Sequence, residues 1–139
     1  MGLGIAVAND PESAHTDEQN FSTHQELGGD EWEEIFVNVL SAPVDTERLP
    51  GEDYQDFLNR RERLFKRDLA DKGYEMLGRS CYILNDVFYA PSEVVKLLDE
   101  CLEVRQKTEN KGALSGLEKL IQACREALKV KSGIFLAAD

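Results

Sequence analysis

The chain has 139 residues, 42% of them hydrophobic, and a formal net charge of -11 at pH 7. This length and apolar content predict one domain over residues 1–139, and the elements predicted below make it α+β and dominated by helices. Such acidity argues against nucleic acid as a partner, because binding phosphates requires a basic surface. No stretch approaches the roughly 18 consecutive apolar residues of a membrane span. Residues 1–8 also lack the features of a signal peptide, so we predict a cytoplasmic protein that does not bind membranes.

The negative charge is concentrated in the first third of the chain. Residues 1–47 contain 11 acidic residues and no Lys or Arg, whereas residues 48–139 contain 16 acidic and 16 basic residues. A segment with charge of one sign attracts a surface of the opposite sign and speeds association with it. The distribution therefore favours a basic protein as the partner.

The chain opens with a predicted strand and a predicted loop. Residues 2–8 alternate Leu3, Ile5 and Val7 with small residues, which is the period of a strand with one branched face and one small face. We expect a helix to approach closely on the small face. Residues 9–30 contain few large apolar side chains, and we predict a long, exposed, acidic and polar loop there.

Residues 30–40 fit two kinds of structure. Their apolar residues follow helical spacing, Asp30 is suited to the N-cap, and acidic residues fill the first turn. The stretch Ile35–Val39 is also good strand composition. Because the start signals belong only to the helix, we favour a helix and leave the strand open.

The middle of the chain predicts a linker at 41–51 and a helix at 52–72 that ends at Gly73. This helix carries a basic cluster, which consists of Arg60, Arg63, Lys66 and Arg67. We expect the cluster to pair with the acidic first third of the chain, with a solvated face as the alternative. Residues 81–89 suit a short strand or a buried loop.

The core is predicted in residues 91–138, which read as helix, helix, strand. Pro91 suits a first helical turn, and Ser115 with Glu118 has the form of a capping box at the start of the second helix, after a connection at 108–114. The final strand, 133–138, repeats the alternation of the first. We expect the two strands to pair, which brings the chain ends into one small sheet.

No catalytic motif is found. Cys81, Cys101 and Cys124 fit neither a disulfide framework nor a zinc site, and we expect reduced core thiols with Cys81 the most accessible. The acidic run at 30–34 lacks the alternating ligands and turn glycine of a calcium loop. The sequence therefore predicts no enzyme, no cofactor and no metal.

The leading hypothesis is a small acidic protein that neutralises or regulates a basic protein partner, most sharply an immunity protein against a toxin. The expected partner-binding residues are Asp17, Glu18, Asp30, Glu31, Trp32, Glu33 and Glu34. Trp32 fits either an interface anchor or a core residue. The alternatives are a small enzyme or ligand-binding domain with a pocket near residues 9–30, and an oligomerising domain. A pocket with converging Asp, Glu or His side chains would favour the enzyme, and a flat acidic face the binding protein.

Overall fold

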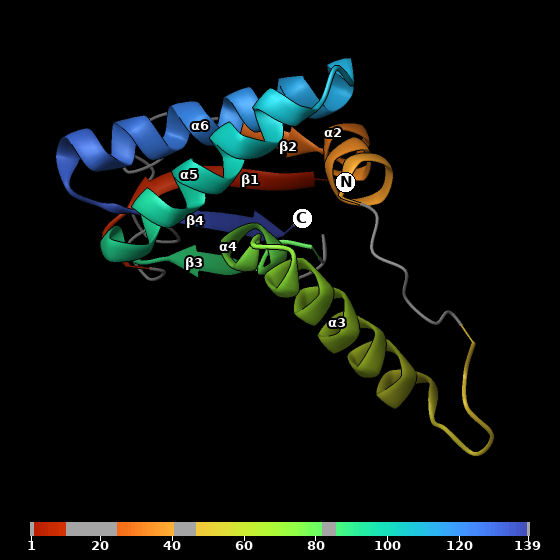
Figure 1. The fold of residues 1–139 in the computed structure, drawn as a ribbon. Helices are drawn as coiled ribbons and strands as arrows, with labels where there is room; N and C mark the ends of the chain where they lie inside the picture. Colours follow the sequence, from red (N-terminus) through yellow and green to blue (C-terminus); the bar gives the residue numbers. More distant parts are fainter. Residues whose placement is uncertain (1, 11–24, 41–46, 82–85, 139) are drawn as a thin grey trace.

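The computed structural model describes residues 2–10, 25–40, 47–81 and 86–138, and it shows two long helices packed on a small antiparallel sheet (Figure 1). In chain order the elements are β1 (Gly2–Ala8), β2 (Gln25–Gly28), α2 (Gly29–Glu33), η2 (Glu34–Val39), α3 (Tyr54–Asp71), α4 (Glu75–Gly78), β3 (Val87–Tyr89), α5 (Pro91–Lys107), α6 (Lys111–Val130) and β4 (Gly133–Ala138). The predicted α+β class with a majority of helix is confirmed.

The sheet joins the two ends of the chain. Its strand order is β2-β1-β4-β3, and all neighbours are antiparallel. In the central pair, Leu3 lies opposite Ala138 and Ala8 lies opposite Gly133. The predicted pairing of the terminal strands is therefore confirmed, and β1 begins where β4 ends (Figure 1).

The two faces of β1 are used differently from our expectation. Its branched residues, Leu3, Ile5 and Val7, join the main core together with the buried side chains of α5 and α6. Its small residues Ala6 and Ala8 lie in a separate cluster with Phe135. The helices thus cover the branched face, where burial stabilises the fold most, and the prediction that a helix approaches the small face is wrong.

The small residues that allow the close packing of a helix are found on α6 and not on β1. α6 turns Ala113, Ala123 and Ala127 inward, all at most 1% exposed. It also places Gly116 so near Ile35 and Leu27 that an added Cβ would lie 2.8 and 2.9 Å from their Cδ1 atoms. Small residues on α6 therefore bring it against both β2 and the helix that follows β2.

The α5–α6 hairpin confirms the predicted helix, helix, strand order but begins its second helix earlier. α6 starts at Lys111, and the Asn110 side chain caps it by accepting the Ala113 amide at 3.0 Å. The predicted capping box at Ser115 and Glu118 is wrong, because both residues lie inside the helix. Asn is a strong N-cap residue, and its position shortens the connection to 108–110.

The predicted loop over 9–30 is wrong at its C-terminal end, where Gln25–Gly28 forms the edge strand β2. Residues 11–24 lie outside the described residues. The helix favoured for 30–40 is confirmed as α2 followed by η2, a π-helical stretch closed by a hydrogen bond from the Leu40 amide to the Ile35 carbonyl at 2.9 Å. Gly28, not Asp30, is the N-cap, because the Glu31 carboxylate accepts the Gly28 amide.

α3 projects from the body of the molecule (Figure 1). It ends at Asp71, with Lys72 as its C-cap and Gly73 next in the left-handed conformation, φ 94°. Next to it, α4 is fixed to α5 by Glu100, whose carboxylate accepts the Met76 and Leu77 amides. The buried Tyr89 hydroxyl donates to the Met76 carbonyl at 2.6 Å. These contacts fix α4, which follows the end of α3 that lies at the body of the molecule, while the other end of α3 extends outward (Figure 1).

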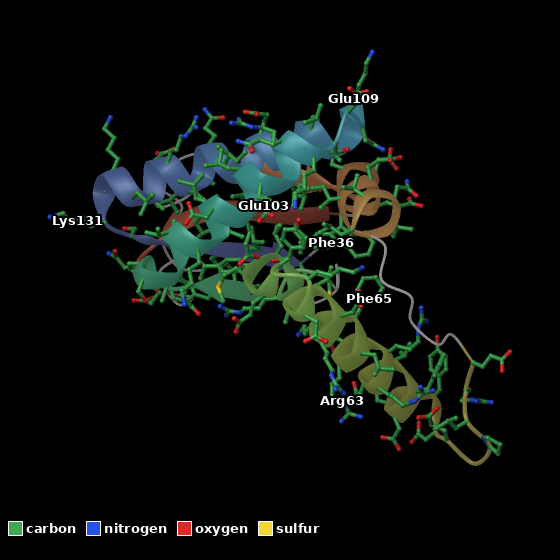
Figure 2. The ribbon with its side chains drawn as sticks, in the orientation of Figure 1. Phe36, Arg63, Phe65, Glu103, Glu109 and Lys131 are labelled. Atoms are coloured by element: carbon green, nitrogen blue, oxygen red, sulfur yellow. The ribbon has the colours of Figure 1, made fainter. Side chains whose placement is uncertain are left out.

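The ion pairs of the basic cluster of α3 are with acidic residues close to it in the chain, and its predicted pairing with the acidic first third stays a prediction. Arg60 binds the Glu52 carboxylate at 2.9 Å and the Glu47 carbonyl, and Lys66 binds Glu62 at 3.0 Å. Figure 2 shows Arg63 on the side of α3 opposite Phe65, and Arg63 has no ion-pair partner among the described residues. Short-range partners one or two turns away compete successfully for these cations.

Candidate functional site

The acidic helix formed by α2 and η2 exposes one stripe of side chains and buries another. Ile35 and Phe36 are both 0% exposed and belong to the main core. Asp30, Glu33 and Val37 are exposed. Their spacing of three and four residues places them along one outer face. The carboxylates predicted to bind a partner are thus divided between two environments.

Glu31 stabilises the fold through contacts with α6 and with the end of β2. Its carboxylate accepts hydrogen bonds from Lys119 at 2.7 Å, from Ser115 at 2.6 Å and from the Gly28 amide at 3.0 Å. Partial burial raises the pKa of Glu31, but these hydrogen bonds outweigh it and hold the pKa below its ordinary value. Lys119 also donates to the Glu26 carbonyl, so this one cation ties α6 to both α2 and β2.

Glu34 is also committed to internal contacts. It accepts hydrogen bonds from Asn38, one turn further along, and from Asn110 at the start of α6. These two hydrogen bonds hold the pKa of Glu34 below its ordinary value. Gly112 permits the contact, because an added Cβ would lie 2.7 Å from Glu34 Cγ.

Trp32 is mainly a packing residue. Its ring lies 5.7 Å from that of Phe36, and its indole Nε1 donates to the Ser80 carbonyl at 3.1 Å. The side chain is partly buried against the main core. The core interpretation of Trp32 accounts for these contacts, and the part that remains exposed borders the groove described below.

An acidic depression of about 530 Å³ lies where α2 meets the start of α6. It is lined by Asp30, Glu31, Glu33, Glu34, Asn110, Lys111 and Gly112. Unlike Glu31 and Glu34, the Asp30 and Glu33 side chains have no hydrogen-bond or ion-pair partner in the described part of the chain. An exposed pair of carboxylates beside a hollow is suited to receive a Lys or Arg side chain. Asp17 and Glu18, also predicted to bind, lie outside the described residues.

A smaller groove, of about 160 Å³, lies further along the acidic helix. It is lined by Trp32, Val37, Leu58, Arg61, Glu62, Phe65 and Cys81. The groove is therefore mostly apolar and sits between the acidic helix and α3. Figure 2 shows Phe65 on the side of α3 that faces this helix.

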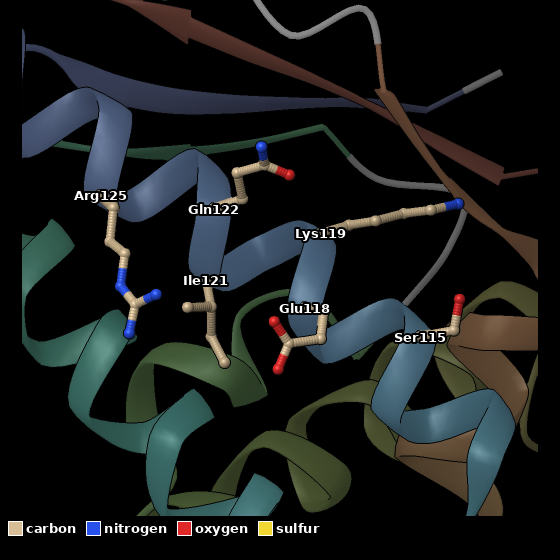
Figure 3. A pocket seen from close by; sticks show the side chains of 6 residues that line it. All are labelled: Ser115, Glu118, Lys119, Ile121, Gln122 and Arg125. Carbon is tan, nitrogen blue, oxygen red and sulfur yellow. The ribbon is translucent and has the colours of Figure 1, made fainter.

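A third hollow, of about 470 Å³, runs along the outer side of α6 (Figure 3). Its polar residues are largely engaged: Ser115 and Lys119 bind Glu31, and Glu118 binds Arg105 at 2.6 Å. Figure 3 shows Lys119 reaching away from α6 toward β2. Because both cations and a carboxylate line this hollow, its surface is not charged with a single sign.

The cysteines are core thiols. Cys101 and Cys124 are 0% exposed and Cys81 is 4% exposed, and all three are free. The prediction of reduced core thiols is therefore confirmed, and Cys81 is the most exposed of the three, as expected. Burial raises the pKa of the Cys81 thiol to about 11 and that of Cys124 to about 12, so neither forms an appreciable thiolate at neutral pH.

Comparisons with protein-family models, curated proteins and solved structures find no match. In the described ranges, no helix combines the length and apolar content needed to cross a bilayer. Among the same residues, no three His, Cys, Asp or Glu side chains come together in a group able to hold a metal ion. His15 and His24 are outside those ranges.

Several residues that shape the site were not identified from sequence. Lys119 and Asn110 hold Glu31 and Glu34 across separations of 88 and 76 residues, for which a single sequence carries no signal. Val37, in contrast, follows Asp30 and Glu33 at helical spacing. Its exposed position on the acidic helix was therefore readable from the pattern.

Proposed function

We propose that this chain is a small acidic protein that binds a basic protein partner and neutralises or regulates it. The observation that carries the proposal is the pair Asp30 and Glu33, two exposed carboxylates beside the acidic depression with no cation bound among the described residues. Their neighbours Glu31 and Glu34 are fixed by α6. The unpaired carboxylates therefore stand on a rigid support, which lowers the entropic cost of binding.

The sharpest form of the proposal is a cytoplasmic immunity protein whose partner is a toxin with a basic active-site cleft. Negative potential from the whole first third of the chain, -11 in formal charge, would steer such a cleft toward the depression. A basic side chain of the partner would then enter between Asp30 and Glu33. Blocking a cleft in this way requires surface complementarity and no chemistry by the inhibitor.

The alternative of a small enzyme or ligand-binding domain gains no specific support. The depression lies at the end of the predicted 9–30 loop, where such a pocket was expected, but it is open to solvent. Two of its four carboxylates are occupied by Lys119 and Asn110. The site thus resembles a recognition surface more than a reaction cavity.

The proposal is tested by affinity capture from the source cell with three versions of the immobilised chain. These are the wild type, the double variant Asp30→Asn with Glu33→Gln, and a matched control, Asp71→Asn with Asp99→Asn, which removes two exposed charges elsewhere. A basic protein should be retained by the wild type and the control at low salt, released at high salt, and largely lost from the double variant. If it is a toxin, co-expression of the wild-type chain should restore growth of cells that produce it.

Two results would contradict the proposal. One is equal retention by the double variant and the wild type, which would assign the charge to solubility. The other is retention that does not decline with salt, because an interaction carried by exposed charges is screened beyond about 8 Å at physiological ionic strength.

A further inference from the structure

We infer that the groove between the acidic helix and α3 is the second half of the same recognition surface, and that it accepts an apolar side chain of the partner with a carboxylate next to it. The inference rests on the proposed function and adds a chemical requirement to it. The partner must present a basic group and, beside it, an apolar side chain with an acidic neighbour.

The groove has room for one side chain, about 160 Å³, and its walls are mostly apolar. Trp32 and Val37 come from the acidic helix, whereas Leu58 and Phe65 come from α3. Val37 is 43% exposed at the rim of the groove. Covering it with an apolar side chain would remove this surface from water.

Arg61 is the reason why the partner is expected to carry a carboxylate next to its apolar side chain. Its Nε atom is buried and has no hydrogen-bond acceptor among the described residues. Its guanidinium carbon lies 5.4 Å from the centre of the Phe57 ring, a contact that positions the cation without satisfying its donors. The other charged residue of the groove, Glu62, is bound to Lys66 at 3.0 Å. A guanidinium that is partly desolvated and lacks a carboxylate favours an incoming anion.

The groove and the acidic depression are connected by the exposed stripe of the acidic helix. Asp30 and Glu33 line the depression, and Val37, one turn further along, lines the groove. One partner segment that follows this stripe would meet negative charge first and then apolar surface with Arg61. The order of these features fixes the direction in which a segment can lie.

Occupancy of the groove has a built-in reporter, because Trp32 lines it and is the only tryptophan of the chain. The probe is 4-phenylbutyrate, an apolar group with a carboxylate, compared with its neutral amide, 4-phenylbutyramide. The acid should change Trp32 emission saturably and bind about fivefold or more tightly than the amide, through the charge-assisted hydrogen bond to Arg61. An Arg61→Met variant, which keeps an apolar stem, should remove this preference. The matched control, Arg63→Met on the opposite side of α3, should keep it.

The inference is overturned if neither compound changes Trp32 emission saturably, if acid and amide bind equally, or if Arg63→Met loses the preference as fully as Arg61→Met. A second copy of the chain is the rival occupant. In that case Trp32 emission and the sedimentation coefficient of the chain alone would depend on protein concentration, and Val37→Asp would abolish both effects. That result would also overturn the inference.

The captured basic partner separates this inference from the proposed function. Val37→Asp lies on the exposed rim and leaves Asp30 and Glu33 unchanged, so it should accelerate dissociation about tenfold or more without slowing association. If Val37→Asp has no effect while the Asp30 and Glu33 double variant fails to bind, the groove inference falls and the proposed function stands. If the effects are reversed, the proposed function falls.

Discussion

The α5–α6 pair and the acidic helix differ in where the cations that bind their carboxylates come from. In the pair, Glu103 binds Lys107 at 2.7 Å and Glu118 binds Arg105 at 2.6 Å, so these two carboxylates take their cations from the same two helices. The acidic helix lies in a stretch of 47 residues that has no Lys or Arg. Its carboxylates must therefore obtain partners from distant elements or remain free. Lys119 forms an ion pair with Glu31, whereas Asp30 and Glu33 have no ion-pair partner among the described residues.

This difference shows how a run of acidic residues should be interpreted. Charge density alone made all four carboxylates equal candidates for binding, yet half of them stabilise the fold. What separates the two halves is the side of the helix that meets α6. Exposed residues one turn apart remain on the outer face, where a partner can reach them.

Thiol reactivity gives the largest expected contrast between the regions. Cys101 and Cys124 lie within the α5–α6 pair, so their labelling in the native protein requires global unfolding and should be slowed about a thousandfold or more relative to the unfolded chain. Cys81 borders the groove beside the acidic helix and should react through a smaller local opening. Timed labelling followed by mass spectrometry of peptides measures all three. Equal protection of the three thiols would show that both regions open together.

Truncation of the core should produce the largest loss of stability. Leu120→Ala or Ile121→Ala removes a side chain that is at most 1% exposed at the centre of the helix pair, and should lower the free energy of unfolding by about 2 to 5 kcal/mol. The control is Leu128→Ala on the same helix, where the side chain is 37% exposed and the loss should be much smaller. Urea denaturation measures both. Losses under about 1 kcal/mol for both core variants would mean that the buried face of α6 is wrongly assigned.

A smaller loss is expected where the acidic helix is attached to α6. Glu31→Gln breaks the ion pair with Lys119 and should lower the free energy of unfolding by about 1 to 2 kcal/mol at pH 7. The pKa of Glu31 is depressed in the folded protein, so its contribution is present above the ordinary value of 4.5 and is lost as the pH falls below it. The difference between wild type and variant should therefore shrink in acid. A difference in the free energy of unfolding between wild type and variant that stays constant from pH 7 to pH 3 would contradict this role of Glu31.

The sequence was sufficient for the features that depend on local pattern. Helical spacing predicted α3, α5 and α6, and alternation predicted that β1 and β4 pair. It failed where local signals compete, as when Asn110 and not Ser115 caps α6. It also failed where distant packing decides, as in the face of β1 that meets the helices. Of the candidate site, the helix was predictable, but its division into bound and free carboxylates depends on Lys119, which is 88 residues away.

The smallest effect on stability is expected for the two free carboxylates. Asp30→Asn with Glu33→Gln removes exposed charges that have no partner among the described residues, so thermal melting should match the wild type within experimental error. A clear fall in melting temperature would place these two residues in the supporting half of the helix, with Glu31 and Glu34.

The central claim is that this same pair of carboxylates receives the partner, and association kinetics test it most directly. Stopped-flow mixing of the captured basic protein with the double variant should give an association rate about tenfold or more below the wild-type rate at low salt, with the difference fading as salt increases. The control that lacks Asp71 and Asp99 should retain most of the wild-type rate. Wild-type association rates for the double variant at every salt concentration would contradict the claim.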